Sequence, residues 1–239
     1  MAAALFRQLQ AQGLRVLNDP TKFLSRSGLL RALYLKRING FNAYRVEEGR
    51  VPERWPVFLR TQGDHTGPRP ALYQTPGELE QGIAGAIAEG LPKSKLVIIE
   101  YMAEQIRPGL FRKLSCFRIG GASVAYTCVH DTRWIAKDGQ LGVTPPDLYD
   151  EELRIVRDDP YGPMLAETFE TAGLEYGRAD FSLVGGKAQI YEINSNPVLK
   201  FDSTHPSPVR LESYRTFREN YLKALKAIDT PSDSVQRRA

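Results

Sequence analysis

The chain has 239 residues, of which 42% are hydrophobic and 25% are charged, and this is the composition of a folded globular protein. Its 32 basic and 28 acidic residues are interleaved along the chain, whereas a nucleic-acid-binding protein gathers basic residues on one element. No stretch approaches the roughly 20 apolar residues that cross a bilayer, and residues 1–17 lack the apolar core of a secretory signal. We therefore expect a cytoplasmic protein that binds neither nucleic acid nor membrane.

The first 40 residues predict two helices. Residues 3–12 form the first, which Gly13 ends, and residues 14–17 predict a short strand before a turn at 18–20. The second helix covers residues 21–37, with Thr21 or Ser25 as its N-cap and Asn39-Gly40 at its end. It carries a modest excess of basic side chains, which we interpret as a solvated face, with an anion-facing surface as the alternative: Arg26, Arg31, Lys36 and Arg37.

Residues 55–61 predict a buried strand, and residues 71–74 predict a second strand that forms a hairpin with it. The polar loop between them runs from Gly63 to Pro68. Pro76 begins a helix that extends to about Glu89. The most apolar strand of the chain follows at residues 95–102.

The second half of the chain predicts two further hairpins. Strands 110–119 and 122–130 turn at Gly120-Gly121, and strands 179–184 and 188–194 turn at Gly185-Gly186. Between the hairpins lie a long loop, 137–150, and a helix, 151–172, that is interrupted near residues 160–163. An amphipathic helix at 208–228 precedes a frayed tail. This order of hairpins and helices along the chain predicts an α+β fold with antiparallel sheets and a hinge near 100–103 that creates a cleft.

The cysteines, Cys116 and Cys128, lie in apolar, strand-like runs without C-x-x-C spacing. We predict that both are buried free thiols, with a cross-strand disulfide as the less favoured alternative.

The sharpest group of polar residues lies on the last predicted hairpin. Glu192 and Asn194 are two residues apart and therefore share a strand face, and the Gly185-Gly186 turn brings Asp180 alongside them. Oxygen ligands of this kind suit Mg²⁺, which takes one or two carboxylates together with nucleotide phosphates. Arg178 lies on the face of Asp180, where it would neutralise a negative intermediate. The alternative for an isolated E-x-N is the solvent face of a strand.

With R-x-D at 178–180 and E-I-N-x-x-P at 192–197, the chain resembles the ATP-grasp superfamily. The resemblance implies two lobes with antiparallel sheets that enclose a nucleotide cleft, and it extends over about residues 14–200. We expect residues 1–20 to be the remnant of a preceding domain that the family usually has. Residues 21–100 would form the N-terminal lobe, 101–207 the C-terminal lobe with the metal site, and 208–239 the C-terminal helix and tail.

The resemblance also implies roles for individual residues. Asp180, Glu192 and Asn194 would hold magnesium, with manganese as an alternative, and Arg178 and Lys113 would be catalytic. Arg60 would bind the α- and β-phosphates together with Lys113 from the opposite lobe. Arg112 and Arg118 are alternatives to Lys113. The adenine pocket would be lined by Glu100, Tyr101 and Met102. The loop over the triphosphate would contribute Gly63, His65 and Gly67.

Three further positions are weaker candidates. His130-Asp131 and Trp134 would form a substrate-recognition edge, or else pack at a strand end with Trp134 in the core. His205 follows the metal strand and is a possible substrate contact. Asp64 would repel phosphate if it faced inward, so we expect it to face out or to touch metal or substrate.

The resemblance implies an ATP- and magnesium-dependent ligase that joins a carboxylate to an amine through an acylphosphate. The substrates would be a small molecule or peptide, and the sequence leaves a homodimer open. Two alternatives use the same cleft. One is a kinase that phosphorylates a hydroxyl of a small molecule, and the other is a non-catalytic nucleotide-binding module that regulates a partner.

Overall fold

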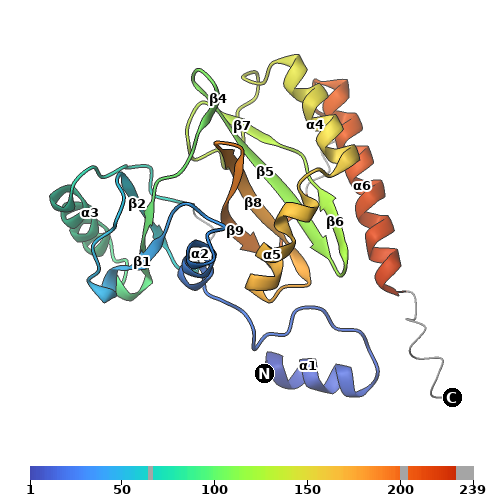
Figure 1. Ribbon diagram of the computed structural model, residues 1–239, viewed down its shortest axis with the longest axis horizontal. Coiled ribbons are helices and arrows are strands. Elements are labelled where there is room, and N and C mark those ends of the chain that lie inside the picture. Colours follow the sequence, from blue (N-terminus) through green and yellow to red (C-terminus); the bar gives the residue numbers. More distant parts are fainter. Residues whose placement is uncertain (64–66, 200–203, 230–239) are drawn as a thin grey trace.

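The computed structural model describes residues 1–63, 67–199 and 204–229, which form two antiparallel sheets (Figure 1). The small sheet has the order β1-β3-β2, with β1 at Ala43–Arg45, β2 at Val57–Thr61 and β3 at Leu96–Glu100. The large sheet has the order β4-β5-β8-β9, from Gln105–Arg107, Leu110–Ile119, Tyr176–Val184 and Lys187–Asn194. Two short strands, β6 (Ala122–Ala125) and β7 (Val129–Asp131), also pair with β5. Residues 101–104 connect the two sheets, at the predicted hinge.

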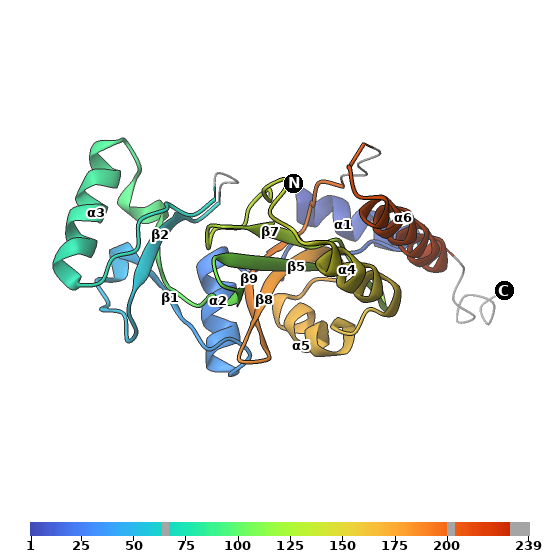
Figure 2. The same ribbon diagram turned by 90° about the horizontal axis from the view of Figure 1, so that it is seen from above.

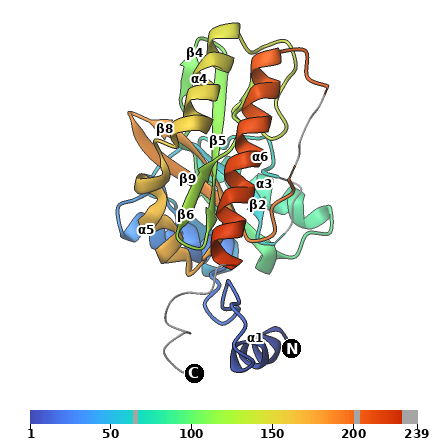
Figure 3. The same ribbon diagram turned by 90° about the vertical axis from the view of Figure 1, so that its right-hand side faces the viewer.

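Helices lie on both sheets (Figures 1 and 2). The helices of the described residues are α1 (Ala2–Ala11), α2 (Arg26–Leu35), α3 (Pro76–Ala88), α4 (Pro146–Asp158), α5 (Gly162–Ala172) and α6 (Pro208–Asp229), with 3₁₀ turns η1 (Val46–Glu48) and η2 (Lys93–Lys95). α3 covers the small sheet, and α4 and α6 lie side by side along the large sheet (Figure 3). α1 extends away from the body and buries none of its residues. No helix of the described ranges is long and apolar enough to cross a membrane.

The helix ends follow from local chemistry. Ser25 caps α2 by accepting a hydrogen bond from the Gly28 amide at 3.3 Å, so the helix begins later than the predicted residue 21. Thr75 caps α3 in the same way. The predicted interruption near 160–163 is confirmed, because α4 ends at Asp158, the next residue, Asp159, has a left-handed conformation, and α5 begins at Gly162. A Cβ atom on Gly162 would lie 2.6 Å from the Ser123 hydroxyl, so only glycine fits where α5 meets β6.

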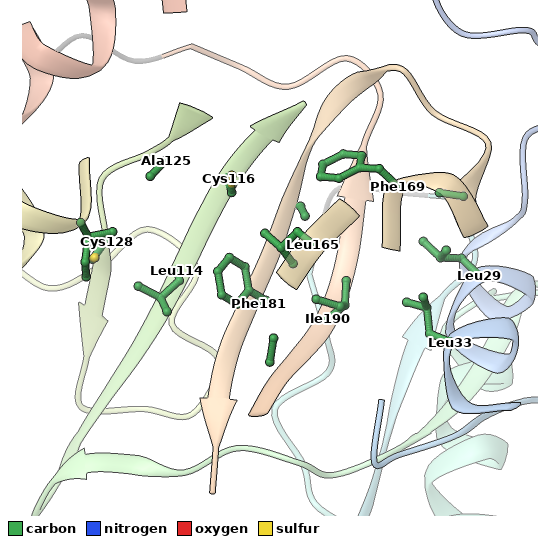
Figure 4. Close-up of a cluster of buried hydrophobic side chains, with 14 residues drawn as sticks. Leu29, Leu33, Leu114, Cys116, Ala125, Cys128, Leu165, Phe169, Phe181 and Ile190 are labelled. Carbon is green, nitrogen blue, oxygen red and sulfur yellow. The ribbon is translucent and has the colours of Figure 1, made fainter. Parts of the chain in front are cut away.

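One face of the large sheet carries the largest core cluster (Figure 4). Leu29 and Leu33 of α2 and Leu165 of α5 pack there on Phe181 and Ile190. The opposite face is covered by α6 only at one end. There, Phe117 and Ile119 of β5 pack against Phe217 and Tyr221 of α6. Because α2 packs on the large sheet, its first residue lies close to the end of β9.

The structure corrects several predicted elements. Residues 14–17 are not a strand, and residues 71–74 contribute only one bridge, between Val57 and Tyr73, because Pro70 and Pro76 bound a segment too short for a ladder. The predicted strand 122–130 is divided into β6 and β7, and the long loop ends at residue 145, where α4 begins. The short strands β1 and β4 were not predicted. Cys116 and Cys128 are buried and free, as expected.

Candidate nucleotide and metal site

The four residues of the predicted site, Arg178, Asp180, Glu192 and Asn194, lie on one face of β8 and β9. Asp180 pairs directly with Glu192, and Arg178 pairs with Asn194. Directly paired residues of antiparallel strands project to the same side, as do residues two apart on one strand. The hairpin therefore brings together the side chains that the sequence predicted to converge, while their role in metal binding stays a prediction.

The Asp180 carboxylate is almost completely buried, with 2% exposure, and is surrounded by donors. Ser115, its partner across β5 and β8, donates a hydrogen bond of 2.9 Å to Oδ1. Arg178 donates from Nε at 2.8 Å and from Nη2 at 3.2 Å. Lys113 Nζ lies 3.7 Å from Oδ2. Two cations and a hydroxyl thus compensate a buried negative charge that would otherwise be costly.

Glu192 is held by cations from two other elements. Arg60 of β2 and Arg26 of α2 approach the same oxygen, Oε2, at 2.6 Å and 3.1 Å. Burial raises the pKa of Glu192, but the charges of Arg60, Arg26 and Lys113 outweigh it, so this pKa lies below its ordinary value. Arg26 also donates to the Thr61 carbonyl. The basic helix residue that we interpreted as solvated therefore joins α2, β2 and β9, in line with the alternative of an anion-facing surface.

Four cations, Arg26, Arg60, Lys113 and Arg178, surround the two carboxylates. The local charge is therefore positive. A site with this excess attracts a polyanion, and a metal ion would compensate the carboxylates.

The space between the two sheets forms a cavity that is partly open to solvent. Arg60 and Lys113 line its polar end together with the two carboxylates, so the predicted phosphate-binding cations of the two lobes face one cavity. The opposite end is apolar. Its wall is formed by Leu30, Phe41, Phe58, Ile99, Tyr101, Met102 and Trp134.

Trp134 joins the two sides of the cavity. Its ring centroid lies 4.8 Å from that of Phe58 and 5.5 Å from that of Tyr101, in an edge-on contact with the latter. Trp134 is half-buried, packs against the core as one interpretation expected, and also lines the cavity, while a role in substrate recognition stays a prediction. The hydroxyl of Tyr191 donates a 2.8 Å hydrogen bond to the Met102 carbonyl, which fixes the segment between the sheets.

Glu100 has a different role from Tyr101 and Met102. Its side chain is 1% exposed and does not line the cavity. The carboxylate accepts hydrogen bonds from the amides of Asn42, Glu53 and Arg54 at 2.9 to 3.0 Å and from the Tyr44 hydroxyl at 2.9 Å. The side chain thus fixes the small sheet, which corrects the prediction that it lines the adenine pocket. A contribution of its backbone stays a prediction.

The loop predicted to cover the triphosphate is described only in part. Gly67 lines the cavity with φ of +91°, a conformation that favours glycine, and Gly63 lines a groove beside Arg26 and Glu192. His65 and Asp64 lie outside the described residues.

The alternatives to Lys113 have other partners. Arg112 pairs with Glu151 at 2.8 Å, and Arg118 donates to the Gly120 carbonyl. Lys113 is the residue of the three that lies at Asp180, and its Nζ also donates to the Lys137 carbonyl at 3.2 Å.

The weaker candidates His130, Asp131 and His205 are not at the carboxylates. Asp131 forms an ion pair with Arg133, and the other two line another cavity, whose wall does not include the carboxylates.

A second cavity opens on the other side of the carboxylates. It shares Lys113, Asp180 and Glu192 with the first, and its wall continues over Arg178 and Asn194. Further along it reaches residues of the C-terminal part, including Pro197, Val198, Arg210 and Tyr214. A molecule in this cavity would touch the polar end of the first, so the arrangement suits a nucleotide on one side and a second reactant on the other.

The residues that the sequence analysis did not predict are Ser115 and Tyr191, and Arg26 was predicted only as an alternative. Ser115 is two residues after Lys113 and therefore shares its strand face, which is a signal that the sequence contains. Arg26 directly follows the N-cap residue of α2, and nothing in the local pattern indicates that this helix end approaches β9.

The sequence matches no protein-family model and no curated protein. Solved structures match the fold. A D-alanine–D-alanine ligase from Bacillus anthracis complexed with ATP superposes with a TM-score of 0.51 over 95% of this chain and 77% of the ligase, at 11% identity. The D-alanine–D-alanine ligase from Coxiella burnetii gives 0.50 over 95% and 68%, at 13% identity. The VanG D-Ala:D-Ser ligase from Enterococcus faecalis gives 0.52 over 93% and 69%, at 12% identity. Identity this low shows the fold alone, and on that ground the chain has the ATP-grasp fold that these ligases share.

Proposed function

We propose that the protein is an ATP- and magnesium-dependent ligase that joins a carboxylate to an amine through an acylphosphate. One observation carries the proposal: Arg60 of β2 and Lys113 of β5 line a single cavity together with two carboxylates that face each other across β8 and β9, and Arg26 of α2 pairs with one of these carboxylates. The ligases with the same fold, one of them in complex with ATP, support it.

The two ends of the cavity suit the two parts of ATP. Adenine would lie in the apolar end, against Tyr101 and Trp134, and the phosphates would lie against Arg60, Lys113 and Arg26. A flat apolar slot next to a group of cations is what a nucleotide requires.

Asp180, Glu192 and Asn194 fit a magnesium ion by their chemistry, because hard cations prefer carboxylate and amide oxygens. The described residues contain no group of three acidic, histidine or cysteine side chains that would hold a metal on their own. The site therefore requires phosphate oxygens from the nucleotide to complete it. When bound, magnesium would withdraw charge from the transferring phosphoryl group, and manganese would suit the same donors.

Binding of nucleotide and metal must replace the ion pairs that are present within the site. In this structure the cations that would hold phosphates, Arg60, Arg26 and Lys113, are paired with Glu192 and Asp180. A metal ion would take over the carboxylates and so release the cations for the phosphates. Nucleotide and metal should consequently bind together much better than either binds alone.

The chemistry needs no nucleophile from the protein. An oxygen of the substrate carboxylate attacks the γ-phosphorus, the bond to the β,γ-bridging oxygen breaks, and ADP leaves. The amine nitrogen then attacks the carbonyl carbon of the acylphosphate, its proton is lost, and phosphate leaves. Arg178 lines the second cavity beside Asp180, where its charge would stabilise the oxyanion of this second step.

Incubation with ATP, magnesium and mixtures of acids and amines tests the proposal. We expect ADP release that requires both an acid and an amine, and a product whose mass equals their sum less one water. Asp180→Asn should abolish the stimulated release, and the exposed Arg215→Lys should leave it unchanged. A product that is heavier by one phosphoryl group would instead identify a kinase. Binding of ATP without any stimulated release would contradict the ligase.

A further inference from the structure

A third cavity, which we call the distal pocket, continues the second one away from the carboxylates. Its residues are Cys128, Val129, His130, Asp138, Gly139, Gln140, Leu141, Thr144, Tyr149, His205, Arg210 and Tyr214. Val129, Asp138, Arg210 and Tyr214 belong to both cavities, so the distal pocket is continuous with the space beside Arg178. The distal pocket is partly open to solvent.

Arg210 is fixed in the wall of the distal pocket. Its Nη1 donates to Glu152, a residue with 0% exposure, and to the Cys128 carbonyl at 2.8 Å. Its guanidinium packs on the Tyr214 ring, 5.0 Å from the centroid, and Nη2 lies 3.4 Å from the Tyr214 hydroxyl. The Nε atom is buried and has no hydrogen-bond partner among the described residues. Among the described residues, the edge formed by Nε and Nη2, which is the edge that grips a carboxylate in a bidentate manner, therefore makes one hydrogen bond, from Nη2 to the Tyr214 hydroxyl.

His130 is a second buried group with unused capacity on the same pocket. Its side chain is 4% exposed, and Nε2 has no partner in the described part of the chain. Burial lowers the pKa of His130 to about 4, with the charges of Arg112, Arg210 and Arg107 acting in the same direction. The ring is thus neutral at physiological pH, in a positive local field. Buried polar atoms usually have hydrogen-bond partners, and Arg210 Nε and His130 Nε2, which have none among the described residues, belong to two side chains that line one pocket.

The remaining polar groups also favour an anion. His205 accepts a hydrogen bond from the Ser207 amide at Nδ1, so Nε2 of its neutral ring carries the proton and is a donor. Arg210 lies in the first turn of α6, at the positive end of the helix dipole. Asp138 is the one acidic residue among the described residues of this wall, and it is exposed. The free oxygen of Glu152 is completely buried, and Glu152 does not line the pocket.

We propose that the distal pocket binds a carboxylate at the far end of a substrate whose other end reacts beside Asp180 and Glu192. The inference rests on the proposed function, because it assigns a property to the substrate of that site. The reacting carboxylate must reach the phosphate, so a carboxylate in the distal pocket is a second one. It belongs either to an amino acid that supplies the amine or to a dicarboxylic acid that supplies the acyl group. Arg210 and His130 are the residues that select it.

Binding measured by isothermal titration to the protein with ADP and magnesium tests this assignment. One arm compares α-amino acids of both configurations with the amines that lack only the carboxylate, and the other compares dicarboxylates with monocarboxylates. In one arm we expect the compound with the additional carboxylate to bind at least about tenfold more tightly, as for a charge-assisted hydrogen bond. The arm that shows the preference identifies which substrate carries the group.

Variants test whether the preference arises in the distal pocket. Arg210→Lys keeps the charge but loses the bidentate edge, and should reduce the preference to less than about threefold. His130→Gln should reduce it in part, which provides a second test if Arg210→Lys does not fold. Arg215→Lys is the matched control on the same helix, since Arg215 is exposed and pairs with Glu212, and it should keep the full preference.

Equal affinities in both arms would overturn the inference and indicate that water alone fills the pocket. A preference that survives both Arg210→Lys and His130→Gln would also overturn it. If the protein binds carboxylates with this dependence on Arg210 but releases no ADP with any acid and amine, the pocket assignment stands and the ligase proposal fails.

Discussion

Glu100 is the last residue of β3 and Glu192 lies near the end of β9, one in each sheet, and their carboxylates have different partners. Glu100 accepts hydrogen bonds from three backbone amides and a tyrosine hydroxyl. Glu192 is held by the guanidinium groups of Arg60 and Arg26. The first set is neutral and consists of loop amides and a hydroxyl beside the small sheet, whereas the second consists of charged side chains from other elements.

This difference separates a structural carboxylate from one that is available to a ligand. Backbone amides cannot leave Glu100 without disrupting the small sheet. Arg60 and Arg26 can leave Glu192 if a metal ion replaces their charge and a phosphate replaces the carboxylate as their partner. The same change, glutamate to glutamine, should therefore weaken nucleotide binding at position 192 and lower stability at position 100.

The largest effect is expected for Glu192→Gln and Asp180→Asn on nucleotide binding. Each removes one negative charge from the proposed metal site and leaves the cations in place, so binding of ATP in the presence of magnesium should weaken by about a hundredfold or more. The stimulation of binding by magnesium should disappear. Equilibrium titration with and without EDTA measures both. Unchanged affinity with intact magnesium dependence would remove these residues from the metal site.

A buried group without a partner provides the second prediction. The pKa of His130 is lowered from 6.5 to about 4, so below pH 6.5 the unfolded chain binds a proton that the folded protein does not. The free energy of unfolding should therefore fall as the pH drops from 6.5 toward 4, by up to about 3 kcal/mol from this residue.

Chemical denaturation of wild type and His130→Gln between pH 6.5 and pH 5 measures this contribution. This range lies above the ordinary pKa of Glu192, which is 4.5, so titration of that carboxylate does not interfere. Wild type should lose more stability over the range than the variant, and parallel curves would show that His130 is not buried as a neutral ring.

Glu100→Gln is expected to affect stability and leave the metal site intact. The amide NH₂ of glutamine cannot accept hydrogen bonds from amide donors, so the variant should lose about 2 kcal/mol of unfolding free energy. Its dependence of ATP binding on magnesium should match that of wild type. A folded Glu100→Gln protein without magnesium dependence would contradict the distinction between the two glutamates.

The smallest effect concerns the apolar end of the cavity. Trp134 contacts Phe58 and Tyr101 there, whereas the second tryptophan, Trp55, packs with the core between the small sheet and α3. Binding of ATP should change tryptophan fluorescence. The change should be lost in Trp134→Phe and retained in Trp55→Phe, with a loss of affinity of no more than about tenfold in Trp134→Phe. A signal that depends on Trp55 would place the nucleotide elsewhere.

Local patterns in the sequence predicted the parts of the fold and site that depend on short-range order. The hairpin turn at Gly185-Gly186 and the two-residue spacing of Glu192 and Asn194 were sufficient to bring the carboxylates to one face. The approach of α2 to β9, and with it the position of Arg26, depends on packing between segments more than 150 residues apart, as the Arg26–Glu192 separation of 166 shows. Glu100 was assigned to the cavity because its strand enters the cleft, and the amides that hold its carboxylate come from loops without a sequence signal.

Thermal unfolding of the wild-type protein with ATP, with magnesium, and with both is the most direct measurement of the central claim. At about one hundred times the Kd, ATP together with magnesium should stabilise the protein by about 2.7 kcal/mol. ATP or magnesium alone should stabilise it much less. The ion pairs between the cations and the carboxylates can break without loss only when phosphate binds the cations and metal binds the carboxylates. No stabilisation by the pair, or equal stabilisation by ATP with and without EDTA, would contradict the assignment of the cavity as a metal–nucleotide site.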